Sequence, residues 1–185
     1  MPQPDVPEVA FVGRSNVGKS SLVNALTGRR TLARVSHTPG ATKQINFFRL
    51  GDSCMLVDLP GYGYAKASRT LAREWQELIF AYLRGRANLA RTLLLLDSRR
   101  GIMPADREAM GLLDRAAVSY AGVLTKLDEL SDAERAQVQA VVSEELARHP
   151  AALPELFATS ARDAAGLESL RDHVAALAGA WRSGL

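Results

Sequence analysis

The feature that most constrains the fold is an alternation, along the whole chain, of short apolar runs with segments of helical periodicity. The runs that predict strands are residues 9–12, 45–50, 54–59, 92–96, 119–124 and 156–158. Strands that alternate with helices pack as a mostly parallel sheet covered by helices on both faces. We therefore expect an α/β fold of three layers.

One pair of predicted strands departs from this alternation. Residues 45–50 and 54–59 are separated by only three residues, Gly51, Asp52 and Ser53. A parallel crossover needs a dozen residues or more, so this connection predicts an antiparallel hairpin. The expected sheet has about six strands, of which one is antiparallel. Because no linker or internal repeat interrupts the pattern, residues 1–185 are expected to form one domain.

Several residues predict how the helices begin and which side they bury. Ser131 and Glu134 have the spacing of a capping box, and Pro104 suits the first turn of the preceding helix. Trp75 and Trp181 fall on apolar stripes of helical spacing, so we expect both in the core. The stripe of the fourth helix is formed by Val138, Val141, Val142 and Leu146.

Composition excludes several classes of protein. A hydrophobic fraction of 47% and a charged fraction of 23% are ordinary for a soluble globular protein. No uncharged stretch approaches the roughly 18 residues that a membrane-spanning helix needs. The first eight residues hold three prolines and two acids, unlike a secretory signal. We expect a monomer in the cytoplasm.

The cysteine and the histidines predict no metal site. Cys54 is the only cysteine and lies in an apolar run, so we expect a buried thiol. His37, His149 and His173 lack metal-ligand spacing and are expected to be solvated loop and helix residues. A net charge of +3 permits an RNA partner without requiring one.

The first motif lies between the strand predicted for residues 9–12 and the helix that follows it. It has the pattern GxxxxGK[ST] and consists of Gly13, Arg14, Ser15, Asn16, Val17, Gly18, Lys19 and Ser20. Such glycines let consecutive backbone N–H groups converge on a β-phosphate at a helix N-terminus. Lys19 would bridge the β- and γ-phosphates, and the Ser20 hydroxyl would ligate Mg²⁺. We interpret the segment as a P-loop.

The second motif ends the predicted strand 54–59. It has the pattern DxxG and consists of Asp58, Leu59, Pro60 and Gly61. The Asp58 carboxylate would hold the Mg²⁺ shell through water, while the Gly61 N–H would approach the γ-phosphate. After a P-loop, this pattern at the carboxyl edge of the sheet predicts a nucleotide-sensing switch.

The third motif follows the predicted strand 119–124. It has the pattern TKxD and consists of Thr125, Lys126, Leu127 and Asp128. Asp128 would accept hydrogen bonds from guanine N1–H and the 2-amino group, which adenine lacks, and the Lys126 stem would lie over the base. After the last strand come the small residues Ala158, Thr159 and Ser160, where a backbone N–H would reach guanine O6.

The sequence segments that contain and flank these motifs resemble the EngB family of bacterial P-loop GTPases, also called YihA or YsxC. The resemblance rests on residues 10–22 (AFVGRSNVGKSSL), 38–42 (TPGAT), 45–48 (INFF), 58–65 (DLPGYGYA) and 96–101 (LDSRRG). It implies a GTPase that acts in assembly of the large ribosomal subunit and is needed for normal cell division and septation. The expected ligands are GTP or GDP and Mg²⁺.

The resemblance also implies further site residues. Thr42 would join Ser20 on Mg²⁺, with Thr38 as the competing threonine. The GTP site would be completed by Ala158, Thr159 and Ser160 and by Gly40, Ala41, Thr42, Lys43 and Gln44. Lys19, Thr42, Gly61 and Asn16 are the residues expected to serve catalysis.

Two positions bear on the rate of hydrolysis. Many GTPases place a water-orienting glutamine directly after DxxG, whereas this chain has Tyr62, which predicts hydrolysis on the order of 10⁻³ s⁻¹ or slower without a partner. Asn16 has two interpretations. It either coordinates a K⁺ ion that supplies catalytic charge or shapes its own loop.

Other functions and contacts stay open at the level of the sequence. A nucleotide-gated scaffold with negligible hydrolysis and a P-loop small-molecule kinase are the alternatives to a GTPase. Five arginines, three in or beside the first switch loop and two in another loop at the sheet edge, would contact RNA phosphates or carry solvated charge. They are Arg29, Arg30, Arg34, Arg99 and Arg100.

Overall fold

The computed structural model describes residues 2–28, 45–63 and 69–183 of the 185-residue chain. The strands are β1 (Glu8–Gly13), β2 (Asn46–Leu50), β3 (Cys54–Asp58), β4 (Leu89–Asp97), β5 (Tyr120–Thr125) and β6 (Ala152–Ala158). The helices are α1 (Lys19–Thr27), α2 (Arg69–Gly85), α3 (Pro104–Ala116), the 3-10 helix η1 (Leu127–Glu129), α4 (Asp132–Leu146) and α5 (Leu167–Arg182).

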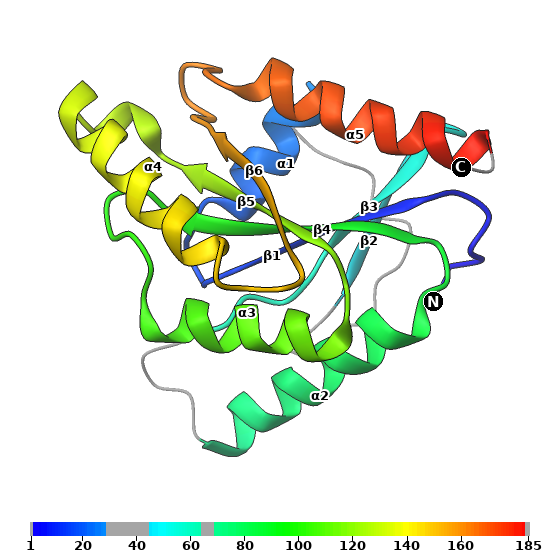
Figure 1. Cartoon of the computed structure of the whole chain (residues 1–185). Coiled ribbons are helices and arrows are strands. Elements are labelled where there is room, and N and C mark those ends of the chain that lie inside the picture. Colours follow the sequence, from blue (N-terminus) through cyan, green and yellow to red (C-terminus); the bar gives the residue numbers. More distant parts are fainter. Residues whose placement is uncertain (1, 29–44, 64–68, 184–185) are drawn as a thin grey trace.

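The six strands form one sheet in the order β2-β3-β1-β4-β5-β6. β2 pairs antiparallel with β3, and every other neighbouring pair is parallel. The predicted mostly parallel sheet of about six strands, one of them antiparallel, is therefore confirmed, hairpin included. Helices cover both faces, with α1 and α5 on one side and α2 and α3 on the other (Figure 1).

Two strands begin earlier than predicted. β4 begins at Leu89 rather than residue 92, because Leu89 pairs with Glu8 of β1. β6 begins at Ala152, which pairs with Tyr120, whereas the predicted strand covered only residues 156–158. Pro154 and Glu155 break the apolar run there, and an edge strand tolerates a proline.

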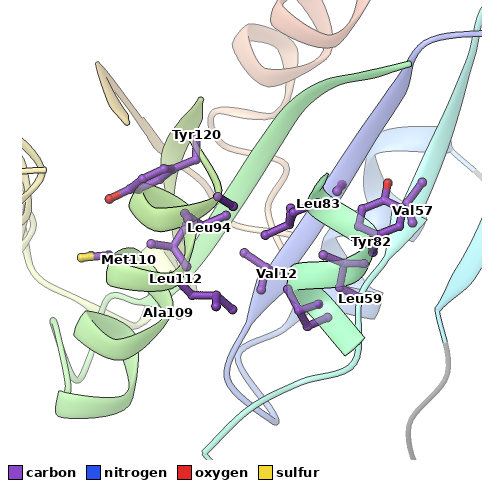
Figure 2. Packing of buried hydrophobic residues seen from close by; sticks show 14 of the residues in the cluster. Val12, Val57, Leu59, Tyr82, Leu83, Leu94, Ala109, Met110, Leu112 and Tyr120 are labelled. Carbon is purple, nitrogen blue, oxygen red and sulfur yellow. The ribbon is translucent and has the colours of Figure 1, made fainter. Parts of the chain in front are cut away.

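The sheet is buried on both faces, as its run of leucines requires. Leu93 and Leu95 face the cluster that includes α1 and α5, while Leu94 and Leu96 face the cluster that includes α2, α3 and α4. Side chains alternate between the faces along a strand, so one strand supplies both cores. Figure 2 shows part of the second core, where Tyr82 and Leu112 pack near the sheet.

The predicted helix starts are confirmed. Ser131 Oγ accepts from the Glu134 backbone N–H, and the Glu134 carboxylate accepts from the Ser131 N–H at 2.8 Å. Pro104 is the first residue of α3. At the far end of α1, Arg171 of α5 donates to the carbonyls of Ala25 and Leu26, and the N–H of the C-cap residue Gly28 also donates to Ala25.

Two predicted core positions are wrong. Trp75 is buried, but Trp181 is 40% exposed, because α5 packs through Leu170, Val174 and Ala178 and Trp181 follows in its last turn. Val141 is 53% exposed while its neighbour Val142 is buried. Successive residues of a helix point about 100° apart, so Val142 faces the core while Val141 lies at the solvent side of the stripe.

The buried thiol at Cys54 is confirmed, and burial raises its pKa. The expectation of solvated histidines is wrong at two positions. His149 Nδ1 lies 2.6 Å from Asp114 Oδ2, and the partly buried His173 ring packs against Phe157, with burial lowering its pKa. His37 lies outside the described residues.

An ionic network that sequence patterns did not predict anchors the start of β1. Glu8 is fully buried, and its carboxylate accepts from Tyr82 Oη at 2.9 Å and from Arg86 Nε at 3.1 Å. Arg86 also forms a second contact with Glu8 through Nη2. The partners are more than 70 residues apart in the chain, so no local pattern links them.

Candidate functional site

The predicted motifs that lie within the described residues meet at the carboxyl edge of the sheet. The P-loop follows β1, the DxxG aspartate ends β3, the TKxD segment begins at the end of β5, and the last small residues follow β6. In open α/β sheets this edge is where ligands bind. Residues Thr38, Gly40, Ala41, Thr42, Lys43 and Gln44, and Arg29, Arg30 and Arg34, lie outside the described residues.

The P-loop has the backbone that its glycines and asparagine permit. Gly18 has φ 100° and Asn16 has φ 63°, both in the left-handed region that these residue types tolerate. A Cβ on Gly13 would lie 2.9 Å from Val17 Cγ1 and 3.1 Å from Leu95 Cβ. The loop therefore requires glycine where it leaves the sheet. The left-handed Asn16 agrees with its loop-shaping interpretation.

Lys19 and Ser20 form the first turn of α1. Lys19 Nζ lies 2.5 Å from Asp58 Oδ1 and 2.5 Å from the Leu59 carbonyl oxygen, which joins the P-loop to the DxxG segment. Ser20 is exposed. A serine hydroxyl and a carboxylate are oxygen donors of the kind that Mg²⁺ prefers, so Ser20 and Asp58 fit the ion.

The DxxG segment packs directly on the P-loop. The Ser15 N–H donates to the Tyr62 carbonyl at 2.8 Å, and the Tyr62 N–H donates to the Gly13 carbonyl at 3.3 Å. A Cβ on Gly61 would lie 3.1 Å from Ser15 N and 3.2 Å from Ser15 Cα. Gly61 therefore lets the two loops approach, and a side chain there would press on the backbone of the P-loop.

Tyr62 points away from this contact into the layer of α2 and α3. Its hydroxyl donates to Asp106 Oδ1 at 2.8 Å, and its ring meets Trp75 edge-on at 5.2 Å between centroids. Trp75 Nε1 in turn donates to the Pro60 carbonyl at 2.6 Å. Burial, followed by the negative charge of Asp106, raises the pKa of Tyr62. The side chain is thus held as a neutral, buried anchor.

The TKxD segment is tied to the P-loop at two points. Thr125 Oγ1 donates to the Val17 carbonyl at 2.6 Å. Lys126, itself left-handed at φ 60°, donates from Nζ to the Asn16 carbonyl at 2.8 Å. A Cβ on Gly18 would lie 3.6 Å from Lys126 Cε, so the lysine stem runs beside the P-loop glycine.

Asp128 is oriented by the segment that follows β6. Its Oδ1 accepts from Ser160 Oγ at 2.7 Å, and its side chain is only 14% exposed. Ser160 and Thr159 are fully buried, and the Thr159 N–H donates to the Leu124 carbonyl. Gly166 supports the same turn. It has φ 69°, and a Cβ there would fall 2.0 Å from the Ala158 carbonyl oxygen.

These residues border a pocket of about 330 Å³. Its lining combines Gly18 of the P-loop, Thr125, Lys126 and Asp128 of the TKxD segment and Thr159 after β6. The pocket thus brings together three predicted segments that are more than 100 residues apart at their extremes. Gly166 was not predicted, because its requirement for glycine comes from a distant carbonyl.

Two further residues at this edge were not predicted as site residues. Asp97 ends β4 and is 8% exposed, and Arg99 follows in the turn. Arg99 was interpreted as an RNA contact or a solvated charge. In the structure Arg99 pairs with Asp97 and with Glu129, which follows Asp128 in η1.

Comparison with known proteins agrees with this geometry. The family model described as 50S ribosome-binding GTPase matches residues 8–126. The probable GTP-binding protein EngB of Rhodospirillum rubrum is 55% identical, with 96% of this chain and 79% of that protein covered. The EngB relative in Cereibacter sphaeroides is 53% identical, with 96% and 82% covered.

Solved structures agree on the fold. The crystal structure of a probable GTP-binding protein EngB superposes with a TM-score of 0.71 over 92% of this chain and 98% of that one, at 24% identity. Aquifex aeolicus Era bound to GDP·AlF4⁻ gives 0.67 at 26% identity, with 94% and 57% covered. The matched family model, these relatives and the P-loop GTPase fold together show that this chain belongs to the EngB family of GTP-binding proteins.

Proposed function

We propose that this protein is a GTP-dependent switch in the assembly of the large ribosomal subunit, is needed for normal cell division, and hydrolyses GTP slowly until a partner stimulates it. The observation that carries the nucleotide assignment is the Asp128 carboxylate, oriented by Ser160 at the edge of the pocket that Gly18 and Lys126 line. The ribosomal role is supported by the matched family's description as a 50S ribosome-binding GTPase.

Guanine selectivity follows from the acceptors that Asp128 offers. A carboxylate has about four lone-pair sites, and Ser160 occupies one of them at Oδ1. The remaining sites can accept from the N1–H and the 2-amino group of guanine. Adenine brings neither donor, so binding it would leave the remaining acceptor sites of a nearly buried carboxylate unsatisfied, at a cost of several kcal/mol.

Phosphate and metal binding are assigned to the P-loop and the DxxG segment. Lys19 pairs with the Asp58 carboxylate in the structure. When GTP binds, the Lys19 ammonium would leave Asp58 and pair with the β- and γ-phosphates. Ser20 would ligate Mg²⁺, Asp58 would act through water, and Thr42 would join them. The ion would supply positive charge to the phosphate oxygens as charge develops there.

Slow hydrolysis is proposed from Tyr62. Its hydroxyl is engaged by Asp106 and its ring lies against Trp75, so it is not placed to orient an attacking water. The missing catalytic charge would come from a ribosomal partner, or from K⁺ held near Asn16. The left-handed backbone of Asn16 is compatible with either role. The same Tyr62 geometry favours, as a second function, a nucleotide-gated scaffold with negligible hydrolysis.

Among residues 2–28, 45–63 and 69–183, no helix combines the length and hydropathy needed to cross a membrane. We propose a cytoplasmic monomer. The test is co-sedimentation with purified large subunits in a non-hydrolysable GTP analogue and in GDP, beside single-turnover hydrolysis in KCl and in NaCl. We expect stronger co-sedimentation with the analogue and at least tenfold faster hydrolysis with the particles.

Four results would each contradict one part of the proposal. Equal co-sedimentation in both nucleotides would remove the ribosomal switch. A rate above about 1 s⁻¹ for the protein alone would remove slow hydrolysis. Equal rates in KCl and NaCl, with and without particles, would exclude the K⁺ role of Asn16. A hydrolysis rate that stays negligible in the presence of large subunits would favour the nucleotide-gated scaffold.

A further inference from the structure

We infer that Asp97 and Arg99 are positioning residues for guanine recognition: together they hold the Lys126 stem beside the pocket and fix the turn that carries Asp128. This inference rests on the proposed guanine site and adds to it two residues of the DSRRG segment that none of the nucleotide motifs contains. Each residue acts through another, and the network has two arms.

The first arm runs from Asp97 to Lys126. Lys126 Nζ donates to Asp97 Oδ2 at 3.0 Å and to the Asn16 carbonyl at 2.8 Å. These two acceptors hold the ammonium on the P-loop side, so the stem between them and the backbone passes Gly18 along the pocket wall. With one acceptor removed, a flexible four-carbon chain would sample other rotamers, and the flat apolar surface for a base would be lost.

The second arm runs from Arg99 to η1. Arg99 Nη1 donates to Glu129 Oε2 at 2.9 Å, and Glu129 is the residue after Asp128 in a helix of three residues. On its other side, Arg99 donates from Nε to Asp97 Oδ1 at 2.9 Å and from Nη2 to Asp97 Oδ2 at 2.7 Å. The planar fork therefore spans two carboxylates, a geometry that a lysine ammonium cannot reproduce.

The ionisation of Asp97 supports this geometry. Burial disfavours its charged form, but hydrogen bonds from Arg99 and Lys126 outweigh burial and lower the pKa of Asp97 to about 2. The carboxylate is therefore charged throughout the physiological range. Burying a negative charge at the end of β4, even with two cationic partners, costs desolvation free energy that an apolar residue there would avoid.

The test compares GDP with inosine diphosphate, which lacks the 2-amino group, by titration calorimetry at fixed salt. The variants are Arg99→Ala, Arg99→Lys and Asp97→Asn. The control is Arg148→Ala, which removes an arginine from an exposed pair with Glu144. Because Arg99 positions Asp128, Arg99→Ala is expected to lower the GDP preference over inosine diphosphate about fivefold, with Arg99→Lys rescuing little of it.

The arm to Lys126 is tested by a double-mutant cycle. Asp97→Asn is expected to weaken GDP roughly tenfold in the wild-type background and about threefold or less in a Lys126→Met background, because its partner is already gone. Equal losses of Asp97→Asn in both backgrounds would overturn this arm.

An unfolding or merely structural effect would lower the affinities for both nucleotides alike. Unchanged discrimination in a folded Arg99→Ala protein would therefore overturn the second arm, as would full rescue by lysine. Failure of the proposed guanine site is a different result: the wild-type protein would then bind ADP as tightly as GDP, whatever the variants do.

Discussion

The hydroxyl of Tyr62 donates a hydrogen bond to Asp106 Oδ1 across 2.8 Å, in a buried contact between the residue after DxxG and the first turn of α3. The other carboxylate oxygen of Asp106 accepts from the Met103 N–H at 2.8 Å. The DxxG segment is thereby attached to the helix layer by a side chain whose position a water-orienting glutamine often occupies.

Removing the Tyr62 hydroxyl tests whether it serves folding or chemistry. Tyr62→Phe is expected to lower the free energy of unfolding by about 1–2 kcal/mol, because Asp106 loses a buried donor, while single-turnover hydrolysis changes less than twofold. Urea denaturation and a quenched hydrolysis assay measure the two effects. The control is Tyr120→Phe, since the Tyr120 hydroxyl is buried without a hydrogen bond to any described residue. A tenfold loss of hydrolysis at unchanged GTP affinity would assign Tyr62 to catalysis.

The pKa of Asp97 predicts a contribution to acid stability. It is lowered from 3.8 to about 2 in the folded protein, so the stabilisation is complete above about pH 5 and is lost as the pH falls toward 2. That difference corresponds to about 2 kcal/mol. We expect the free energy of unfolding of wild type to exceed that of Asp97→Asn by less at pH 3 than at pH 6. A gap that widens on acidification would contradict the charged, paired state of Asp97.

Alanine substitutions at Gly166 and Gly51 distinguish the stability cost of a left-handed backbone from the cost of a steric clash. Both are left-handed, but a Cβ on Gly166 would meet the Ala158 carbonyl at 2.0 Å, whereas nothing lies within 4 Å of one on Gly51. Gly51→Ala is expected to cost about 1 kcal/mol of unfolding free energy. Gly166→Ala is expected to cost about 3 kcal/mol or more and to weaken GDP, because the turn that orients Asp128 must move. Equal costs in urea denaturation would show that the close approach is relieved cheaply.

Short sequence patterns predicted the parts of the fold that depend on interactions between residues close together in the chain. A three-residue connection leaves only an antiparallel pairing for β2 and β3, and Ser131 with Glu134 suffices to start α4. The early residues of β6 were missed because Pro154 and Glu155 interrupt the apolar run, and their strand is set by pairing with β5. Val141 was misplaced because a stripe of valines does not reveal which of two neighbours the sheet will cover.

The site residues likewise fall into those that contiguous motifs predicted and those that only long-range contacts bring together. Contiguous motifs predicted the P-loop, DxxG and TKxD segments, which the fold brings to one edge. The links from Arg99 to Glu129 and from Ser160 to Asp128 join residues about 30 apart, where no periodicity marks them. Arg99 therefore looked like free charge in the sequence, and only the folded turn brings its partners within reach.

The central claim is that the Asp128 carboxylate selects guanine. Its most direct test is equilibrium binding of GDP, xanthosine diphosphate and ADP to wild type and to Asp128→Asn. Wild type is expected to prefer GDP over ADP by at least about a hundredfold, and the variant is expected to lose GDP affinity and gain preference for xanthosine diphosphate, because an amide offers a donor to the xanthine 2-oxo group. Wild-type protein that binds ADP as well as GDP, or a variant with unchanged GDP affinity, would contradict the account.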